Sequence, residues 1–411
     1  MKQVYLDGAA NAPIDKRVIK AMKPYLKPGF CGNSRSAHRY GAIADQAVYS
    51  ARLCISKCLG VEEDEVFFTS GATESNNWAI KALALAELAK PAKERRTRIV
   101  CTATEHASVL AACDSLVPLG FEIVRVAPSI NGGVASVDMR KAIKGGRTFL
   151  VCCMAINNET GAYNPADTIA EVAHDAGALC LCDVTQAMSL GGRTIDFGVN
   201  YPHVDMLSFS AHKIYGPTGV GCLIKRKGVE LPPLLSGGAQ EFGLRGGTNN
   251  VAGIVGMAEA VRLLAEDASL EDTYIETQNL FFAECRKALG HQPLLTAFPI
   301  HRNIVSLRLG EDLDYPGPSV ADAFAAKGIA VSAGAACSNG SDGQELSHVL
   351  SSMGMNERAI RHTVRVSFTK FTTKEDIKAF AKALSELKAL YPKGRKAQGA
   401  ATRYCPWKGR G

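Results

Sequence analysis

The 411-residue sequence lacks the features that mark membrane, secreted and zinc-binding proteins. No uninterrupted apolar stretch comes near the roughly twenty residues that span a bilayer, and no charged-then-apolar leader follows Met1. The 13 cysteines include no Cys-x-x-Cys pair of zinc-site spacing and no even framework of a short secreted chain. We therefore expect no membrane insertion, no secretion and no metal site, and unpaired cysteines favour a reducing cytoplasm.

A strong charge of either sign is also absent. The net charge is only +7, part of it lies in residues 393–411, and the rest of the chain shows no basic stripe. A nucleic-acid-binding role would need such a stripe, so we expect no direct nucleic-acid partner. With 46% hydrophobic residues and a mean hydropathy near zero, the chain can bury a full core and divide into two domains.

Short apolar runs alternate with helical patterns such as residues 168–175. This alternation predicts an α/β fold whose main element is a largely parallel sheet of seven strands. The strand-like runs are 66–68, 99–102, 122–126, 149–154, 179–183, 206–209 and 220–225.

A long helical stretch, residues 251–266, leads from this region into a smaller α+β portion. Strand-like runs in that portion are 303–309, 329–332 and 363–368. We expect a large domain over residues 15–260, a small domain from residues 1–14 and 261–392, and a basic, flexible tail over 393–411.

One lysine, Lys213, lies in an informative local sequence. It follows Ser208-Phe-Ser-Ala-His212, after a run that suits a buried strand, and a glycine turn comes next. Burial and nearby cationic or phosphate-binding groups lower the pKa of a lysine and free its amine for Schiff-base chemistry. A surface lysine is the alternative at this point, and the rest of the chain decides between the two.

An aldehyde cofactor on Lys213, pyridoxal phosphate, would need a carboxylate at its ring nitrogen, a cradle for its phosphate and a flat group on its ring. Asp183 follows a short apolar run that reads as a buried parallel strand, so its carboxylate would lie at a strand end. Gln186, or Asn158 in a separate loop, could reach the ring hydroxyl; each alone is more often a loop hydrogen-bonder.

A phosphate cradle is offered by the segment 67–75, which runs from an apolar strand through Gly71 and Ala72 into a helix over 76–89. Backbone N–H groups and the helix dipole bind an anion at such a helix start. Ser210 and His212 add two side-chain donors, although a Ser/Thr/Gly turn alone is usually an ordinary cap. His106, after another strand-like run, could stack on the cofactor ring.

Cys337 differs from the other cysteines, most of which lie in apolar runs and read as buried small hydrophobes. It lies in a stretch of small and polar residues, 332–343, that cannot form a packed core and predicts a flexible loop. A reactive thiol needs access and a lowered pKa, which a loop over a cationic site could provide.

The chain carries an ordered set of short motifs between residues 3 and 390. The motifs are Tyr5-Leu-Asp-Gly-Ala9, Gly32-Asn-Ser-Arg-Ser-Ala-His38, Thr69-Ser-Gly-Ala-Thr-Glu-Ser-Asn76, Glu105-His106, Asn157-Asn-Glu-Thr-Gly161, Asp183-Val-Thr-Gln186, Ser208-Phe-Ser-Ala-His-Lys-Ile-Tyr-Gly-Pro217, Arg245-Gly-Gly-Thr248 and Val364-Arg-Val-Ser-Phe368. In this order they resemble those of cysteine desulfurases, the fold-type I pyridoxal phosphate enzymes whose group includes selenocysteine lyase. The resemblance implies the large and the small domain of that fold.

The resemblance implies a role for each matching residue. Lys213 would bind the cofactor aldehyde, Asp183 its ring nitrogen and Gln186 its ring hydroxyl, with His106 on the ring face. The phosphate would be held by Ala72, Thr73, Ser210 and His212, together with Thr248 of a neighbouring subunit, which implies a homodimer. Arg365 would bind the substrate carboxylate through its planar fork, and Asn33 would also contact substrate.

The same resemblance makes Cys337 the cysteine that takes sulfur from L-cysteine as a persulfide, leaves L-alanine and passes sulfur to an acceptor protein. That acceptor could be an iron–sulfur scaffold or a carrier for tRNA thiolation. The local sequence, Ser332-Ala-Gly-Ala-Ala-Cys-Ser-Asn339, departs from the common desulfurase pattern and is similar to that of selenocysteine lyases. A selenocysteine lyase, an ordinary aminotransferase or a non-catalytic sulfur-pathway scaffold are therefore the alternatives.

Overall fold

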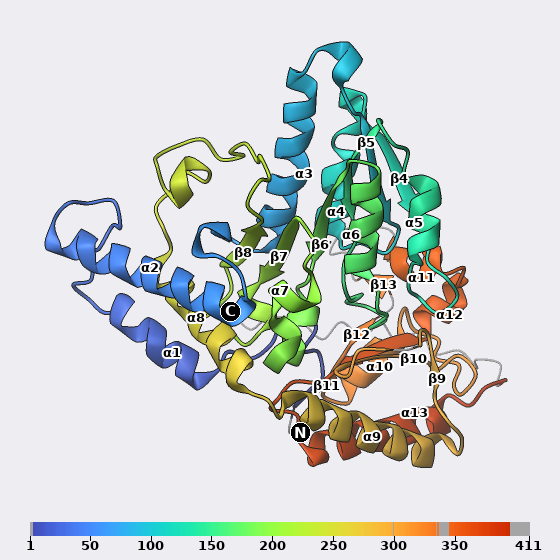
Figure 1. Cartoon of the computed structure of the whole chain (residues 1–411). Helices are drawn as coiled ribbons and strands as arrows, with labels where there is room; N and C mark the ends of the chain where they lie inside the picture. The colour runs from blue at the N-terminus through green and yellow to red at the C-terminus, as the bar shows by residue number, and fades with distance from the viewer. Residues whose placement is uncertain (1–2, 299, 334, 337–344, 395–411) are drawn as a thin grey trace, which may run out of the picture.

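The structure is a computed structural model that describes residues 3–298, 300–333, 335–336 and 345–394 (Figure 1). Cys337 therefore lies outside the described residues. Of the predicted tail over 393–411, only residues 393 and 394 are described. Within the described residues, no helix combines the length and the apolar character that a membrane span requires.

A seven-stranded sheet forms the centre of the larger part, as the sequence predicts. Its strand order is β2-β8-β7-β6-β5-β3-β4, and all neighbours are parallel except β8, which runs antiparallel to both β2 and β7. The strands are β2 Val66–Thr69, β3 Arg98–Thr102, β4 Glu122–Val126, β5 Thr148–Cys152, β6 Leu179–Asp183, β7 Met206–Ser210 and β8 Gly221–Lys225. These bounds lie within two residues of the predicted runs.

Helices cover both faces of this sheet, because apolar side chains point from it in both directions. The buried side chains of α3 and α4 pack on one face, and those of α2, α6 and α8 contribute to the core on the other (Figure 1). The helices of this part are α1 Lys16–Met22, α2 Arg39–Leu59, α3 Ala72–Ala89, α4 Ala107–Asp114, α5 Ser136–Ala142, α6 Ala166–Asp175, α7 Phe197–Asn200 and α8 Val251–Glu266.

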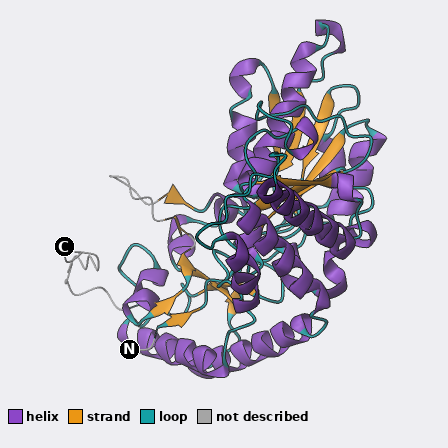
Figure 2. Cartoon of the chain, turned by 90° about the vertical axis from the view of Figure 1, so that its left-hand side faces the viewer, coloured by secondary structure: helices purple, strands orange, loops and turns teal. Residues whose placement is uncertain are grey.

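A smaller antiparallel sheet of order β12-β15-β10-β9 lies beside the long helices α9 and α13, as Figure 2 shows. Its strands are β9 Leu294–Leu295, β10 Ile304–Arg308, β12 Ser332–Ala333 and β15 Thr363–Ser367, and β13 Ala335–Ala336 pairs separately with β14 Glu345–Leu346. The helices are α9 Leu270–Leu289, α10 Val320–Ala326, α11 His348–Ser352, α12 Glu357–Arg361 and α13 Lys374–Leu390. The whole is a fold-type I α/β architecture.

Two predicted elements have different bounds in the structure. The run 329–332 is not one strand: β11, Ile329–Ala330, pairs with the N-terminal strand β1, Val4–Tyr5, while β12 pairs with β15. The chain changes partner at Val331, which no local pattern records. Helix α3 begins at Ala72 instead of Asn76, because the turn at Gly71 leads straight into helical backbone.

The N-terminal segment joins the two sheets. After β1 it continues to the large sheet, where the Ala12 N–H donates to the His212 carbonyl at 2.9 Å and the Asp15 N–H to the Tyr215 carbonyl at 3.0 Å. The buried core is likewise continuous from the large sheet into the small one. Residues close to position 10 are therefore held between the two parts of the molecule.

Candidate active site

Lys213 lies where the sequence predicts, just past the carboxyl end of β7. It ends the short 3₁₀ turn η7, Ala211–Lys213, and its Nζ donates to the carbonyl of Ala9 at 2.8 Å and to that of Ala10. Burial, and then the nearby Arg365 guanidinium, lower the pKa of Lys213 to about 8, against the opposing effect of two neighbouring carboxylates. A substantial fraction of this amine is therefore neutral at mildly alkaline pH.

The backbone after Lys213 is strained. Tyr215 has a φ of 65°, in the left-handed region that non-glycine residues avoid. Its buried hydroxyl holds this conformation, since it contacts the Tyr274 hydroxyl at 2.5 Å and accepts the Lys370 N–H at 2.9 Å. The turn thus fixes the backbone on which the lysine is carried.

Asp183 occupies the carboxyl end of β6 and is 7% exposed. Its carboxylate accepts from Asn76 Nδ2 at 3.0 Å and from the Thr185 N–H at 3.0 Å. Asn76 is itself fixed by Ser208, whose hydroxyl donates to Asn76 Oδ1 at 2.5 Å. Both of these donors are neutral, and in the described structure no cation pairs with this carboxylate.

The predicted phosphate cradle corresponds to the first turn of α3, a helix of 18 residues. The Ala72 N–H donates to Ser210 Oγ at 2.7 Å, which joins the helix start to the strand that carries Lys213. Burial and the nearby Lys213 lower the pKa of His212 to about 4, so its ring is neutral at physiological pH. Thr73 lies in the same turn and is exposed.

Glu74 and Arg245 link this cradle to a distant loop. Arg245 makes two hydrogen bonds to the Glu74 carboxylate, at 2.8 and 3.0 Å, and the Ser70 N–H donates to the same carboxylate at 2.8 Å. Burial raises the pKa of Glu74, but the Arg245 contacts outweigh it and the net pKa is lowered. Thr248, three positions beyond Arg245, is exposed, and no hydrogen bond of its side chain is present among the described residues.

His106 is the N-cap of α4, and its Nδ1 accepts from the Ser108 N–H at 3.1 Å. This bond leaves Nε2 to carry the proton of the neutral ring. Gln186 is 5% exposed, and its Nε2 donates to the Ala9 carbonyl at 3.0 Å. Lys213 donates to the same carbonyl, so the two side chains lie close together. Asn158 contributes its backbone carbonyl to Arg365, and no contact of its side chain is seen in the described part.

Arg365 lies on β15 and is brought to the same place. Its Nη1 donates to the Asn158 carbonyl at 2.8 Å, and its Nη2 donates to Asp7 Oδ1 at 2.8 Å and to Ser332 Oγ at 2.6 Å. Its Nε is buried without a partner among the described residues. An orphaned buried donor on a guanidinium fits a site that receives a carboxylate.

Asn33 is held by its own loop, since its side chain accepts the Arg35 N–H at 3.0 Å, and no contact in the described structure joins it to Lys213 or Arg365. Cys337 lies outside the described residues. No role was predicted for Asp7, for the carbonyls of Ala9 and Ala10, or for Asn76, although Asp7, Ala9 and Asn76 lie in the motifs quoted above and Ala10 follows one of them. Their contacts are long-range, so no local pattern could have assigned them.

Taken together, the site fits pyridoxal phosphate on its own contacts: a lysine of lowered pKa, a carboxylate held by neutral donors, and a helix start with a hydroxyl and a neutral histidine. When bound, this cofactor supplies an aldehyde for amines and a ring that stabilises negative charge at the substrate Cα.

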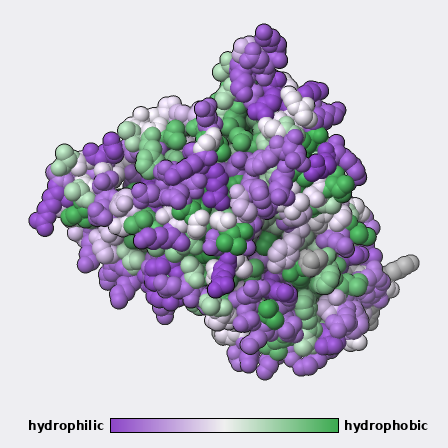
Figure 3. All heavy atoms as spheres, viewed as in Figure 1, coloured by the Kyte–Doolittle hydropathy of each residue, from purple (hydrophilic) through white to green (hydrophobic). Residues whose placement is uncertain are grey.

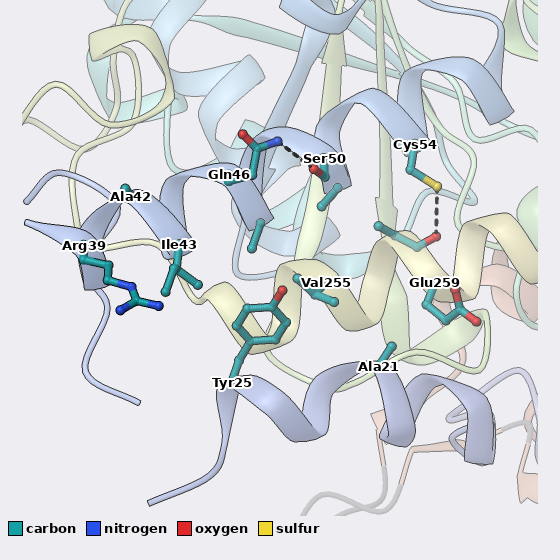
Figure 4. Close-up of a pocket in the computed structure, with 13 residues that line it drawn as sticks. Ala21, Tyr25, Arg39, Ala42, Ile43, Gln46, Ser50, Cys54, Val255 and Glu259 are labelled. Carbon is teal, nitrogen blue, oxygen red and sulfur yellow. Dashed lines mark hydrogen bonds between the residues drawn. The ribbon is translucent and has the colours of Figure 1, made fainter. Parts of the chain in front are cut away.

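A separate hollow of about 590 Å³ lies away from these residues, between α1, α2 and α8. Figure 4 shows Tyr25 and Ile43 facing it and Cys54 at its far end. On the face in Figure 3, hydrophobic residues are interspersed with hydrophilic ones and form no broad continuous patch. None of the predicted site residues lines this hollow.

Comparison with known proteins agrees with this geometry. A family model described as aminotransferase class-V matches residues 4–380. The chain is 37% identical, over 92% of its length and 92% of the relative's, to a protein named cysteine desulfurase IscS from Dictyoglomus turgidum. It resembles the solved structure of a NifS-like protein with a TM-score of 0.83, 32% identity, 94% of this chain and 100% of that one covered. A structure titled SspA in complex with cysteine gives a TM-score of 0.75, 30% identity and coverages of 90% and 100%.

Proposed function

This chain belongs to the cysteine desulfurase family of class-V aminotransferases, and from that premise we propose that it is a pyridoxal phosphate-dependent enzyme that converts L-cysteine to L-alanine. The observation that carries the proposal is the proximity of Asp183 and Arg365 to Lys213: the three come from different elements, and both charges act on the lysine amine. A relative whose structure is titled as a complex with cysteine supports the choice of substrate.

In this proposal Arg365 binds the substrate carboxylate, and its unpartnered Nε provides one of the donors. Lys213 holds the proton removed from the substrate Cα at its Nζ, for which a pKa of about 8 is well placed. The carbonyls of Ala9 and Ala10 hold that amine near the reacting carbon when it carries the proton. His106, which is exposed and carries its ring proton on Nε2, exchanges protons with solvent.

Asp183 would pair with the ring nitrogen of the cofactor and favour its protonated form, since its carboxylate has no cationic partner among the described residues. Ala72, Thr73, Ser210 and His212 would hold the phosphate, and Gln186 or Asn158 would hold the ring hydroxyl. Asn33 assists in substrate binding.

Cys337 is the proposed acceptor of the sulfur atom. Its thiolate forms an S–S bond to the substrate sulfur as the Cβ–S bond breaks, and the carbon skeleton gains a proton and leaves as alanine. The net change, L-cysteine plus thiol to L-alanine plus persulfide, is balanced without an external oxidant. The persulfide sulfur then passes to an acceptor protein, and we place the reaction in the cytoplasm.

We further propose that the active form is a homodimer to which each subunit lends Thr248. The loop that carries Thr248 is tethered on both sides yet leaves this residue exposed. Arg245 pairs with Glu74, and Asn249 Nδ2 donates to Glu241 Oε1 at 2.9 Å. Glu241 in turn pairs with Arg52 at 2.9 Å in the interior. An exposed residue in so firmly held a loop suits delivery to a neighbouring subunit.

The decisive experiment measures alanine release from L-cysteine and from L-selenocysteine by wild type and Cys337→Ala under reducing conditions. A desulfurase uses both substrates, and the variant loses turnover of L-cysteine. Cys31→Ala, which removes an exposed thiol elsewhere, is the matched control and should retain activity.

Strong preference of the wild type for L-selenocysteine would make the protein a selenocysteine lyase. Turnover of L-cysteine that is indifferent to Cys337→Ala would favour an ordinary aminotransferase-like reaction. If neither substrate yields alanine, a non-catalytic scaffold is the alternative that remains.

A further inference from the structure

Asp7, in the N-terminal motif Tyr5-Leu-Asp-Gly-Ala9, is the closest anion to the guanidinium of Arg365 in the described structure. Its Oδ1 lies 2.8 Å from Arg365 Nη2, and the two side chains are 19% and 10% exposed. The Ser332 hydroxyl donates to the same Oδ1 at 2.8 Å and accepts from the same Nη2 at 2.6 Å. The site that is to receive a substrate carboxylate thus already contains one.

The backbone of Asp7 is fixed against β15, which keeps the root of its side chain beside Arg365. The Ser367 N–H donates to the Leu6 carbonyl at 2.8 Å and the Gly8 N–H to the Ser367 carbonyl at 3.1 Å. A Cβ on Gly8 would lie 2.7 Å from the Phe368 carbonyl oxygen, so the segment follows β15 at backbone contact. Arg365 is two residues from Ser367 on that strand, which keeps the two charges side by side.

The register of the small sheet completes the arrangement. Ser332 on β12 is directly opposite Arg365 on β15, so the hydroxyl lies beside the guanidinium by strand pairing. Nη2 has two hydrogens, and Asp7 and Ser332 accept both. A substrate carboxylate that takes Nε must therefore share the guanidinium with Asp7 or displace it from Nη2.

We propose that Asp7 is an affinity-setting residue that weakens the hold of Arg365 on the carboxylates of substrate and product. This inference rests on the proposed role of Arg365. Two carboxylates on one guanidinium repel each other, and the repulsion is larger in a partly buried site than in water. The consequence for turnover is that L-alanine, which keeps the carboxylate of the substrate, is released without competing strongly with the next L-cysteine.

The charges around Lys213 give a second readout. Arg365, Asp7 and Asp183 all act on this amine: Arg365 lowers its pKa, and the two carboxylates raise it. His212 also faces it and is neutral. Removal of the Asp7 charge should therefore lower the pKa of Lys213 further, and this effect can be observed in the protein without its cofactor.

The test is a spectroscopic titration of the holoenzyme with L-alanine and with ethylamine, which is alanine without its carboxylate. Asp7→Asn keeps an acceptor oxygen and the size of the side chain but removes the charge. We expect the ratio of the ethylamine to the L-alanine dissociation constant to rise about fivefold, the size of effect that a partly exposed charge pair supports. A ratio that is unchanged or lower in Asp7→Asn would overturn the proposal.

Two variants separate charge from hydrogen bonding and from misfolding. Ser332→Ala frees one Nη2 hydrogen of Arg365 without changing charge. A rise in its ratio as large as that in Asp7→Asn would mean that donor occupancy, and not charge, sets the affinity, and would overturn the proposal. Asp7→Glu keeps the charge and should also resemble wild type; if it instead shows the increased ratio, charge is not the cause.

In the protein freed of cofactor, the pH dependence of Lys213 acylation, followed by mass spectrometry, should have a lower midpoint in Asp7→Asn than in wild type. An equal or higher midpoint would contradict the proposed electrostatics. If the wild type releases no alanine from L-cysteine, the result counts against the proposed function alone. The ratio of dissociation constants and the midpoint of Lys213 acylation can both be measured without turnover.

Discussion

At the scale of single residues, Glu105 shows how burial changes the pKa of an ionisable group. It precedes His106 and is 1% exposed. Its Oε1 accepts from the Thr102 hydroxyl and from the Met154 N–H, both at 2.7 Å, while its Oε2 has no partner in the described structure. Burial, opposed by these hydrogen bonds, raises the pKa of Glu105 to about 7. The proton on this carboxyl is therefore part of the folded state at acidic pH.

The raised pKa predicts a pH dependence of stability. The folded protein keeps a proton that the unfolded chain loses above about pH 4.5, so stability falls as the pH rises from about 4.5 to 7 and then levels off. A shift of this size corresponds to on the order of 3 kcal/mol. Glu105→Gln cannot ionise, so urea unfolding at pH 5, 6, 7 and 8 should show a smaller decline than wild type.

Glu87 provides the matched control, because it is also buried but is paired with Lys90 and Arg96. Burial raises its pKa, but these cations outweigh burial and the net pKa is lowered. It contributes stability above its unfolded pKa, which is lost only as the pH falls through the folded value. Glu87→Gln should therefore be less stable than wild type by a similar amount from pH 6 to 8. A parallel decline for wild type and Glu105→Gln would contradict the assignment to Glu105.

The sequence could predict a site residue where the chemistry requires a particular side chain and that side chain directly follows a strand-like run. Lys213, Asp183 and the start of α3 all follow apolar strand runs, and parallel strands end at one edge of a sheet. The contacts of Asp7 and of the Ala9 carbonyl were not predictable, because they join residues more than 170 positions apart. A backbone carbonyl carries no signature in the sequence at all.

At the scale of elements, the start of α3 depends on how closely β8 approaches it. Gly221, the first residue of β8, leaves room for Gly71: a Cβ on Gly221 would lie 2.5 Å from Gly71 Cα. Gly71 immediately precedes the Ala72 N–H that bonds to Ser210. The proposed phosphate cradle can therefore take this position only because Gly221, on the neighbouring strand, has no side chain.

Gly221→Ala should displace the turn at Gly71 and weaken binding of pyridoxal phosphate to the cofactor-free protein by about tenfold or more. Overpacking of this kind also costs about 1–3 kcal/mol of stability. An absorbance titration with the cofactor and a urea unfolding curve measure the two effects. Gly145→Ala, at a position with open space around it and an ordinary φ, should change neither. Equal cofactor affinity in wild type and Gly221→Ala would refute this account of the cradle.

The bounds of elements followed from the sequence where hydrophobic periodicity is strong. The helix over residues 251–266 has the predicted bounds, and so do β4 and β6. The division of 329–332 into β11 and β12 was missed, because it results from pairing with β1 on one side and β15 on the other. Tertiary partners decide where so short an extended segment is divided.

At the scale of the whole molecule, the proposed homodimer makes a prediction about mixed subunits. If Thr248 acts in the neighbour's site, a dimer of one Lys213→Ala and one Thr248→Ala subunit has one site with both residues intact. Each variant alone should have little activity, and co-expressed mixtures should regain alanine release from L-cysteine. If Thr248 acts within its own subunit, the mixture has no intact site and remains inactive.

The matched control for this experiment is a mixture of Lys213→Ala with Asp183→Ala. Both residues lie in one site of one chain, joined through its own strands, so no mixed dimer contains a complete site. Before the mixtures are tested, analytical ultracentrifugation of the wild type should show a dimer. Recovery of activity in the control mixture would mean that complementation does not report on Thr248.

We also propose that the chain divides near residue 260, as the composition suggests, with the N-terminal residues belonging to the smaller part. The pairing of β1 with β11 and the position of α8 before the small sheet support this division. The continuous core nevertheless indicates that the two parts fold against each other.

The sequence by itself determined the α/β class and the positions of the seven strands, and it predicted the lysine, the carboxylate and the helix start of the proposed site. These depend on local periodicity and on groups that lie within a few residues of a strand end, and both are recorded along the chain. Only the tertiary structure decided that Asp7 shares Arg365 with Ser332, that Ala9 and Ala10 hold Lys213, and that Gly221 admits Gly71. Those contacts depend on where three separate strands and the N-terminal segment meet, which is a property of the packed molecule.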